Sequence, residues 1–257
     1  MRNIAMLVEY CGTDFLGFQV QAKGPTVQGT LAESVAQLTG EKVQLIGSGR
    51  TDSGVHAWGQ VVNFHTRSTI PPERFAYALN GRLPRSLRVR KSWEAPLGFH
   101  ARFSAIAKTY DYWIYYSSQP AALWDDRAWR LHRALDLAAV RAAIPHLLGE
   151  HDFTSFCASN SNVRDFVRRV EKLDVKEATL PGDYPLVVFS ITANGFLYKM
   201  ARNIVGTLVE VGLGRRVPEE VPQILEARDR NLAGKTAPAH GLYLAKVYYP
   251  EGYVPED

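Results

Sequence analysis

Residues 43–65 read VQLIGSGRTDSGVHAWGQVVNFH, and this stretch decides the fold of the first half of the chain. Val43 and Leu45 alternate with polar residues as in a half-buried strand, and Val61-Val62-Asn63-Phe64 resumes a strand further on. A glycine-rich connection joins the two strands without a helix. Asp52 therefore lies on a loop between two neighbouring strands.

The loop itself is typical of one that presents a carboxylate. Gly47, Gly49 and Gly54 permit positive φ and close approach of a ligand or of another backbone. Arg50 precedes Asp52 by two residues, so in extended backbone both side chains point to one face and the guanidinium can hold the carboxylate ionised. An ordinary Asp turn with a structural arginine is the alternative interpretation. A phosphate-binding loop is disfavoured, because no Gly-Lys-Ser/Thr ending is present and the next element is a strand.

The elements expected around this loop follow the order β-α-β-β-α-β. They are strand 3–10, helix 27–38, strand 43–47, strand 60–65, helix 72–81 and strand 87–94. Thr26 is a typical helix N-cap before an apolar-periodic run, and the residues Pro71-Pro72-Glu73 open the second helix.

The rest of the chain repeats the order, with one additional short helix. These elements are strand 108–116, helix 135–148, strand 167–176, strand 186–193, helix 197–213, short helix 217–228 and strand 241–249. We therefore predict an α+β protein of two ferredoxin-like halves, residues 1–105 and 106–257, with the segment 96–106 as the crossing point. Helices cover the outer face of antiparallel sheets, which leaves the other face free, and the two sheets join around a central basic cleft.

Composition indicates a globular protein with a basic surplus. Of 257 residues, 46% are hydrophobic and 22% charged, and the formal net charge of +4 favours a polyanionic partner. Two clusters of cations are candidate phosphate contacts, although solvated surface charge is the alternative for each. Their members are Arg82, Arg85, Arg88, Arg90 and Lys91 in the first, and Arg164, Arg168, Arg169 and Lys172 in the second.

Several classes of protein are disfavoured by the residues. The two cysteines, Cys11 and Cys157, are too few for a disulfide framework, and the seven histidines lack metal-ligand spacing, so no metal is expected. The N-terminus lacks a signal-like apolar stretch and no run is long enough to span a membrane, so we expect a cytoplasmic protein.

Two further elements could carry chemistry. The strand 108–116 is rich in aromatics and places Tyr110 and Tyr112 on one face; strand aromatics usually pack a core, but they can also stack on a nucleobase. In the helix 197–213, Lys199, Arg202 and Asn203 stand at i, i+3 and i+4 near the helix N-terminus. A phosphate or carboxylate site is one interpretation of this face, and a solvated helical face is the other.

Together these residues resemble the tRNA pseudouridine synthase A family over nearly the whole chain. The loop from Gly49 to Ala57 is similar to the signature of that family. Supporting matches are Gly17-Phe18-Gln19, Thr26-Val27-Gln28-Gly29-Thr30-Leu31, Phe99-His100-Ala101-Arg102-Phe103-Ser104-Ala105, Lys108-Thr109-Tyr110-Asp111-Tyr112, His151-Asp152-Phe153-Thr154-Ser155-Phe156, Gly195-Phe196-Leu197-Tyr198-Lys199-Met200-Ala201-Arg202-Asn203 and Ala237-Pro238-Ala239-His240-Gly241-Leu242. Cys11 and Phe18 depart from the Asp and Trp that the family often has there, and both lie outside the Asp52 loop.

The resemblance implies an isomerase with the pseudouridine synthase fold. Its members convert uridine to pseudouridine at positions 38, 39 and 40 in the anticodon stem-loop of tRNA, without cofactor or metal, as homodimers in which one tRNA contacts both subunits. Asp52 matches the essential carboxylate, Tyr110 matches the active-site tyrosine, and Tyr112 is left to the core. Arg50 and Arg202 are implied to hold Asp52 charged, and the implied substrate contacts are Tyr110, Arg50, Lys199, Arg202, Asn203 and His56.

Two other functions compete with this interpretation. A non-catalytic RNA-binding protein shares the ferredoxin-like topology, but the Lys/Arg-Gly-Phe/Tyr-type strand of RRM modules is not present. A glycosidic-bond hydrolase normally needs two carboxylates at a fixed separation, and the loop supplies only Asp52.

Overall fold

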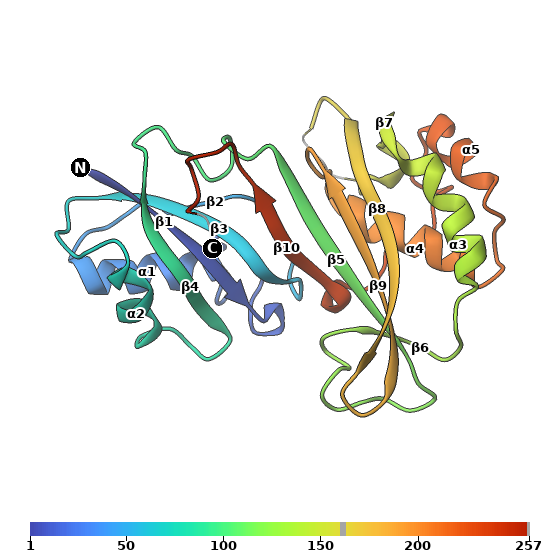
Figure 1. Ribbon diagram of the computed structural model, residues 1–257, viewed down its shortest axis with the longest axis horizontal. Helices are drawn as coiled ribbons and strands as arrows, with labels where there is room; N and C mark the ends of the chain where they lie inside the picture. Colours follow the sequence, from blue (N-terminus) through green and yellow to red (C-terminus); the bar gives the residue numbers. More distant parts are fainter. Residues whose placement is uncertain (160–162, 256–257) are drawn as a thin grey trace. The chain divides into compact units, whose positions relative to one another are not determined.

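The computed structural model describes residues 1–159 and 163–255 (Figure 1). The chain divides into two compact units, residues 1–108 with 243–257, and residues 109–242. We expected everything after residue 105 in the second half, and the last strand corrects that expectation. β10 (Leu242–Tyr248) pairs in parallel with β3 (His56–Thr66), with Tyr243 opposite His56, and so belongs mostly to the first unit. No helix among the described residues is long and apolar enough to cross a membrane.

The first unit has the ferredoxin-like element order that the sequence predicts. Its elements besides β3 and β10 are β1 (Arg2–Tyr10), the 3-10 turn η1 (Gly12–Asp14), α1 (Val27–Thr39), β2 (Ile46–Gly47), α2 (Arg74–Asn80) and β4 (Leu87–Ala95). β1 is antiparallel to both β3 and β4, with Ile4 opposite Phe64 on one side and Glu94 on the other. The short β2 and β10 pair with different ends of β3.

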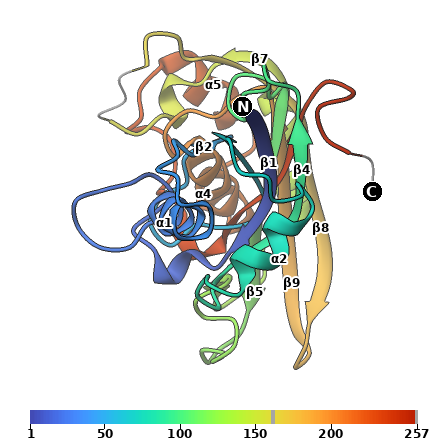
Figure 2. The same ribbon diagram turned by 90° about the vertical axis from the view of Figure 1, so that its left-hand side faces the viewer.

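One face of this sheet packs on the two helices. α1 and α2 lie side by side (Figure 2), and the rings of Phe64 and Phe75 meet edge to face at 5.7 Å. Thr26 caps α1 by accepting a hydrogen bond from the Gly29 N–H at 3.2 Å, as its position predicts. The apolar residues Val27, Leu31 and Val35 are fully buried. Helix and sheet therefore share a core that the apolar periodicity specifies.

The other face of the sheet is covered by the segment 96–106. Asn3 donates to the carbonyls of Pro96 and Phe99, both at 2.9 Å, and Asn63 donates to Asn3 at 2.9 Å. Asn63 also accepts from the Ala101 N–H at 2.9 Å. This face was expected to be free, and at the end that carries Asn3 and Asn63 the expectation was wrong: two buried asparagines bind the backbone of the segment.

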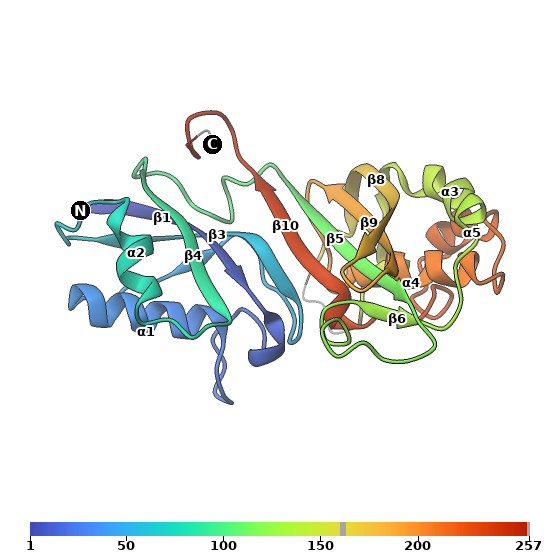
Figure 3. The same ribbon diagram turned by 60° about the horizontal axis from the view of Figure 1, so that its bottom comes forward.

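The second unit contains the remaining elements. They are β5 (Ala107–Tyr116, from Thr109 on), β6 (Trp129–Leu131), α3 (Leu137–Ala143), η2 (Ile144–Leu147), β7 (Gly149–Asp152), η3 (Thr154–Phe156), β8 (Val167–Leu180), β9 (Tyr184–Ala193), α4 (Met200–Gly212), α5 (Glu220–Ala227) and η4 (Ala239–Gly241). Its strands lie in the order β5-β9-β8-β7, and β6 pairs with β5. α4 is buried along most of its length and packs against α3, and Figure 3 shows the helices gathered beside β8 and β9.

Several bounds differ from the predicted ones for local reasons. The helix expected from residue 197 begins at Met200, because Lys199 has left-handed backbone (φ 59°). The helix expected over 135–148 continues beyond Ala143 as a 3-10 turn that contains Pro145, which lacks the N–H that an α-helix needs. The strand expected over 43–47 is reduced to Ile46–Gly47, and β3 begins at His56, four residues early.

Candidate active-site loop and basic helix

Asp52 lies on the loop between β2 and β3, as predicted, and is half-buried. The segment 12–18 holds this loop by hydrogen bonds on either side of Asp52. The Phe18 N–H donates to the Thr51 carbonyl at 3.0 Å, and the Ser53 hydroxyl donates to the Phe15 carbonyl at 3.2 Å. Within the loop, the Val55 N–H donates to the Asp52 carbonyl at 3.1 Å. The backbone that carries the carboxylate is therefore fixed by its neighbours.

The loop also depends on a close approach at Gly12. A Cβ on Gly12 would lie 2.0 Å from the Val55 carbonyl oxygen, so only glycine fits against the loop here. Gly12 donates its N–H to His56 Nδ1 at 3.0 Å. Among the three loop glycines that we expected to allow unusual backbone, Gly54 has a positive φ of 80°, and Gly47 packs against the ring of Phe18.

Arg50 does not form the ion pair that the spacing predicts. The side chain is exposed, and in residues 1–159 and 163–255 it makes no ion pair with Asp52. A contact of Arg50 with substrate stays a prediction.

His56 is buried in β3 rather than presented by the loop, with 2% of its surface exposed. Because Nδ1 accepts from Gly12, this nitrogen carries no proton. The ring stacks on Tyr243 at 4.8 Å between centroids, and Tyr243 in turn stacks on Trp58 at 4.3 Å. These contacts favour a structural role for His56, in which the ring holds the loop in place, rather than the predicted contact with substrate.

In the second unit, β5 carries the predicted tyrosine. Tyr110 is 7% exposed, and its ring meets Phe196 edge to face at 4.8 Å. Tyr112, two residues further on, is fully buried, and its hydroxyl donates to the Pro238 carbonyl at 2.7 Å. Burial raises the pKa of Tyr112 well above its usual value. The assignment of Tyr112 to the core is thus confirmed.

Arg202 lies in the first turn of α4 and is clamped by the segment that follows α5. Its Nε donates to the Ala237 carbonyl at 2.7 Å, and the Ala237 N–H donates back to the Arg202 carbonyl at 3.1 Å. One turn further along α4, a Cβ on Gly206 would lie 1.8 Å from the Lys235 carbonyl oxygen. This glycine lets the segment cross close to the helix, so the guanidinium of Arg202 is held in one orientation.

The other two polar residues of this helix have different surroundings. Asn203 is fully buried, donates to the Phe156 carbonyl at 2.7 Å, and accepts from Thr236 at 2.6 Å and Arg230 at 3.0 Å. These partners favour a structural role for Asn203 over the predicted substrate contact. Lys199 precedes the helix, and its Nζ lies 4.9 Å from the centre of the Tyr198 ring. The single helical face expected for the three residues is therefore not formed.

Several arginines of the two basic clusters form hydrogen bonds or ion pairs within the protein. Arg88 donates to the carbonyls of Leu83, Pro84 and Leu87, and Arg90 pairs with Glu9 at 3.5 Å. In the second cluster, Arg168 lies 4.0 Å from Asp165 and Arg169 lies 3.2 Å from Glu150. Within these two clusters, the exposed cations that form no ion pair in the described part of the chain are Arg82, Arg85, Arg164 and Lys172.

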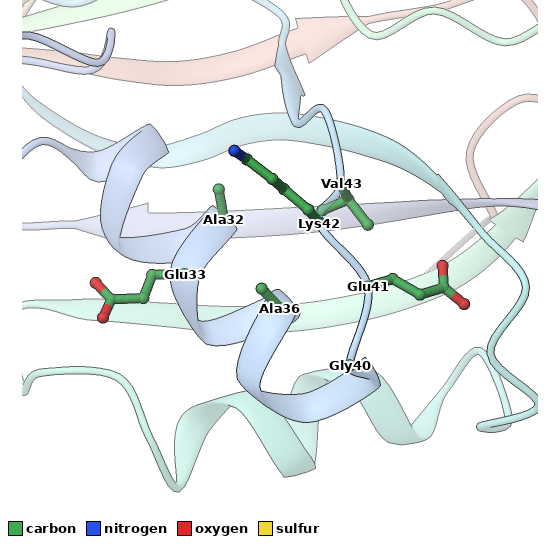
Figure 4. A pocket seen from close by; sticks show the side chains of 7 residues that line it. All are labelled: Ala32, Glu33, Ala36, Gly40, Glu41, Lys42 and Val43. Carbon is green, nitrogen blue, oxygen red and sulfur yellow. The ribbon is translucent and has the colours of Figure 1, made fainter.

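A surface hollow of about 480 Å³ lies between α1 and the residues that follow it (Figure 4). Its lining residues are Ala32, Glu33, Ala36, Gly40, Glu41, Lys42 and Val43. Glu41 is held by the Thr66 hydroxyl at 2.8 Å and by the Arg67 N–H, and these hydrogen bonds lower the pKa of its carboxyl. None of the predicted site residues lines the hollow. The described residues also contain no group of three or more His, Cys, Asp or Glu side chains that could hold a metal ion.

The family model for tRNA pseudouridine synthases matches residues 6–104 and 143–250. The chain belongs to this family. The tRNA pseudouridine synthase A of Acetivibrio thermocellus is 47% identical over 249 residues, covering 97% of this chain and all of that protein. The enzymes of the same name from Moorella thermoacetica and Bacillus subtilis are 45% and 46% identical, covering 97% and 94% of this chain and 100% and 97% of theirs. The expected resemblance and the pseudouridine synthase fold are confirmed.

The segments matched to tRNA pseudouridine synthases contain both the Asp52 loop and the first turn of α4 with Arg202. Tyr110 lies in the part between the two matched segments. The Asp52 loop and the clamped arginine are thus features of the family portion of the chain, and Tyr110 is assigned by the motif around it alone.

Proposed function

We propose that this chain isomerises uridine to pseudouridine at positions 38, 39 and 40 in the anticodon stem-loop of tRNA. The observation that carries the proposal is the Asp52 loop. It is half-buried, tied by hydrogen bonds to residues Phe15 and Phe18, and lies within a chain that matches tRNA pseudouridine synthases over both family segments.

The reaction breaks the N-glycosidic bond, turns the uracil and joins its C5 to the ribose carbon, and the hydrogen at C5 leaves as a proton. Asp52 either adds covalently to the ribose or to the base, or removes a ribose proton as a general base. Each route begins from the ionised carboxylate. The family resemblance assigns Arg202 to keep that carboxylate charged.

Tyr110 is assigned to stack on the target base and to assist proton transfer at C5. A hydroxyl on a ring held by Phe196 has both properties, because the ring supplies a flat apolar surface and the hydroxyl can exchange protons. Arg50 and Lys199 are assigned to the RNA backbone, where their charge offsets part of the cost of unstacking the base.

Recognition of RNA shape and backbone, more than of base sequence, fits action at several neighbouring uridines. By the same resemblance we propose a homodimer whose substrate tRNA contacts both subunits. The proposed compartment is the cytoplasm, where the substrate is found.

Incubating the purified protein with unmodified tRNA tests the proposal. Nucleosides released by complete digestion are separated and identified by mass and retention time. Pseudouridine at positions 38–40 is the expected product. Release of free uracil would identify a glycosidic-bond hydrolase instead, and tRNA that binds but stays unchanged would identify an RNA-binding protein.

A further inference from the structure

A buried chain of polar side chains runs beneath the Asp52 loop in the first unit. The Ser48 hydroxyl donates to Gln60 Oε1 at 2.5 Å, and Gln60 Nε2 donates to the Gly49 carbonyl at 3.0 Å. The same Nε2 donates to the Tyr10 hydroxyl at 3.4 Å. Tyr10 and Thr51 share a hydrogen bond of 2.8 Å between their hydroxyls. The chain therefore ends on the residue that directly precedes Asp52.

These side chains are shielded from water, which makes each hydrogen bond matter. Ser48 and Gln60 are fully buried, Tyr10 is 4% exposed and Thr51 is 7% exposed. In the described part of the chain, no buried side-chain nitrogen or oxygen lacks a hydrogen-bond partner. Removing one hydroxyl would leave its partners unsatisfied in an apolar surrounding, and the backbone around them would have to move.

The local geometry of β1 and β3 directs Tyr10 to this place. The pairing slips by one residue between Val8, which lies opposite Gln60, and Tyr10, which lies opposite Ala57. Irregularities of this kind redirect a side chain and are frequent next to functional sites. Burial raises the pKa of Tyr10 to about 12, so its hydroxyl keeps its proton at neutral pH.

Tyr10 also sits beside the second anchor of the loop. Two residues after it, the Gly12 N–H donates to His56 Nδ1 on the far side of Asp52. The last residue of β1 thus holds one flank of the loop at Thr51 through its side chain, and the first residue of η1 holds the other at His56 through its backbone N–H. Since Asp52 lies between these anchors and directly follows Thr51, its carboxylate follows their positions.

We propose that Tyr10 is a positioning residue for Asp52, acting through Thr51 and supported by Gln60. The inference rests on the proposed function of Asp52. Tyr10 contributes no contact to substrate; its hydroxyl holds the loop in the place from which the carboxylate reacts.

The test compares Tyr10→Phe with Tyr115→Phe. Tyr115 is a matched control in the second unit: it is fully buried, its hydroxyl donates to Asp125 at 2.8 Å and it accepts from the Ala121 N–H at 3.2 Å. Each variant loses one buried hydroxyl and two hydrogen bonds. For both we would measure single-turnover pseudouridine formation with enzyme in excess, the dissociation constant for tRNA by filter binding, and the unfolding midpoint.

Tyr10→Phe is expected to lower the single-turnover rate by about ten-fold or more, because sub-ångström errors in placing a reacting group are costly. Its dissociation constant for tRNA should stay within about two-fold of wild type, since loss of one buried hydroxyl leaves the charged surface unchanged. Tyr115→Phe should show a similar fall in unfolding midpoint and the wild-type rate. Adding Thr51→Val to Tyr10→Phe should lower the rate no further, because both changes break the same hydrogen bond.

A wild-type rate for Tyr10→Phe, equal rate losses in Tyr10→Phe and Tyr115→Phe, or a loss explained by weaker tRNA binding would each overturn the positioning role. An additive loss in the double variant would do the same. If the wild-type protein forms no pseudouridine, the proposed function fails and the positioning role fails with it.

Discussion

Replacing Gly12 by alanine is the perturbation whose effect on the Asp52 loop follows most directly from distances. The new Cβ would lie 2.0 Å from the Val55 carbonyl oxygen, where contacts below 3.0 Å are essentially never found. The backbones at Gly12 and Val55 therefore have to separate by about 1 Å. The new Cβ is fixed to the backbone and the Val55 oxygen belongs to it, so no change of side-chain rotamer relieves the clash.

The separation strains two hydrogen bonds that locate Asp52. These are the bond from the Gly12 N–H to His56 and the bond from the Val55 N–H to the Asp52 carbonyl. Overpacking costs about 1–3 kcal/mol and a weakened hydrogen bond about 1 kcal/mol, so the free energy of unfolding should fall by about 2–4 kcal/mol. A shift of about 1 Å in a reacting group lowers the rate by about 100-fold.

Denaturant unfolding and single-turnover pseudouridine formation together measure both effects. Gly81→Ala is the matched control, because Gly81 has an ordinary φ of −71° and its Cβ would meet nothing closer than 3.7 Å. The control should keep the wild-type rate and a free energy of unfolding within about 1 kcal/mol of wild type. A Gly12→Ala protein that turns over as fast as wild type would refute the reasoning.

Three further predictions concern other parts of the chain. Tyr110→Phe should keep the ring contact with Phe196 but slow turnover by losing the hydroxyl, and Tyr110→Leu should slow it further; equal single-turnover rates for all three proteins would make Tyr110 a core residue. The double variant Arg82→Gln/Arg85→Gln should reduce the slope of log Kd for tRNA against log salt by about 1.4–1.8, and an unchanged slope would show that these arginines are only solvated. Burial lowers the pKa of Lys108 from 10.5 to about 8. Between these two pH values the unfolded chain therefore binds more protons than the folded chain, and the free energy of unfolding rises with pH. Wild type should accordingly gain stability relative to Lys108→Met between pH 8 and pH 10 in denaturant titrations, and a constant difference would contradict the shift.

Elements whose signals are local were predictable from the sequence. α1 begins at Val27 because Thr26 caps it, and its apolar residues repeat at helical spacing. β1 and β4 lie within about one residue of the expected bounds, because runs rich in apolar and β-branched residues mark both strands. The position of Asp52 between two strands was predictable for the same reason.

Features that depend on residues distant in the sequence were not predictable. The cover over one sheet face rests on Asn3 and Phe99, which are 96 positions apart and give no periodic signal. Tyr10 and Thr51 are likewise separated by 41 positions. The sequence places Asn203 on a basic helical face, yet its partners are Phe156 in η3 and Arg230 and Thr236 in the segment that follows α5. Such polar networks form only once the chain has folded.

The central claim is that the carboxylate of Asp52 performs the reaction, and one measurement tests it most directly. Wild-type protein and Asp52→Asn are incubated with tRNA that carries tritium at C5 of uridine, and release of tritium to water is followed alongside tRNA binding. The amide cannot be ionised and cannot replace the carboxylate as nucleophile or base. We predict tritium release by wild type, none above background by Asp52→Asn, and dissociation constants for tRNA within a few-fold of each other. Substantial tritium release by Asp52→Asn would contradict the account.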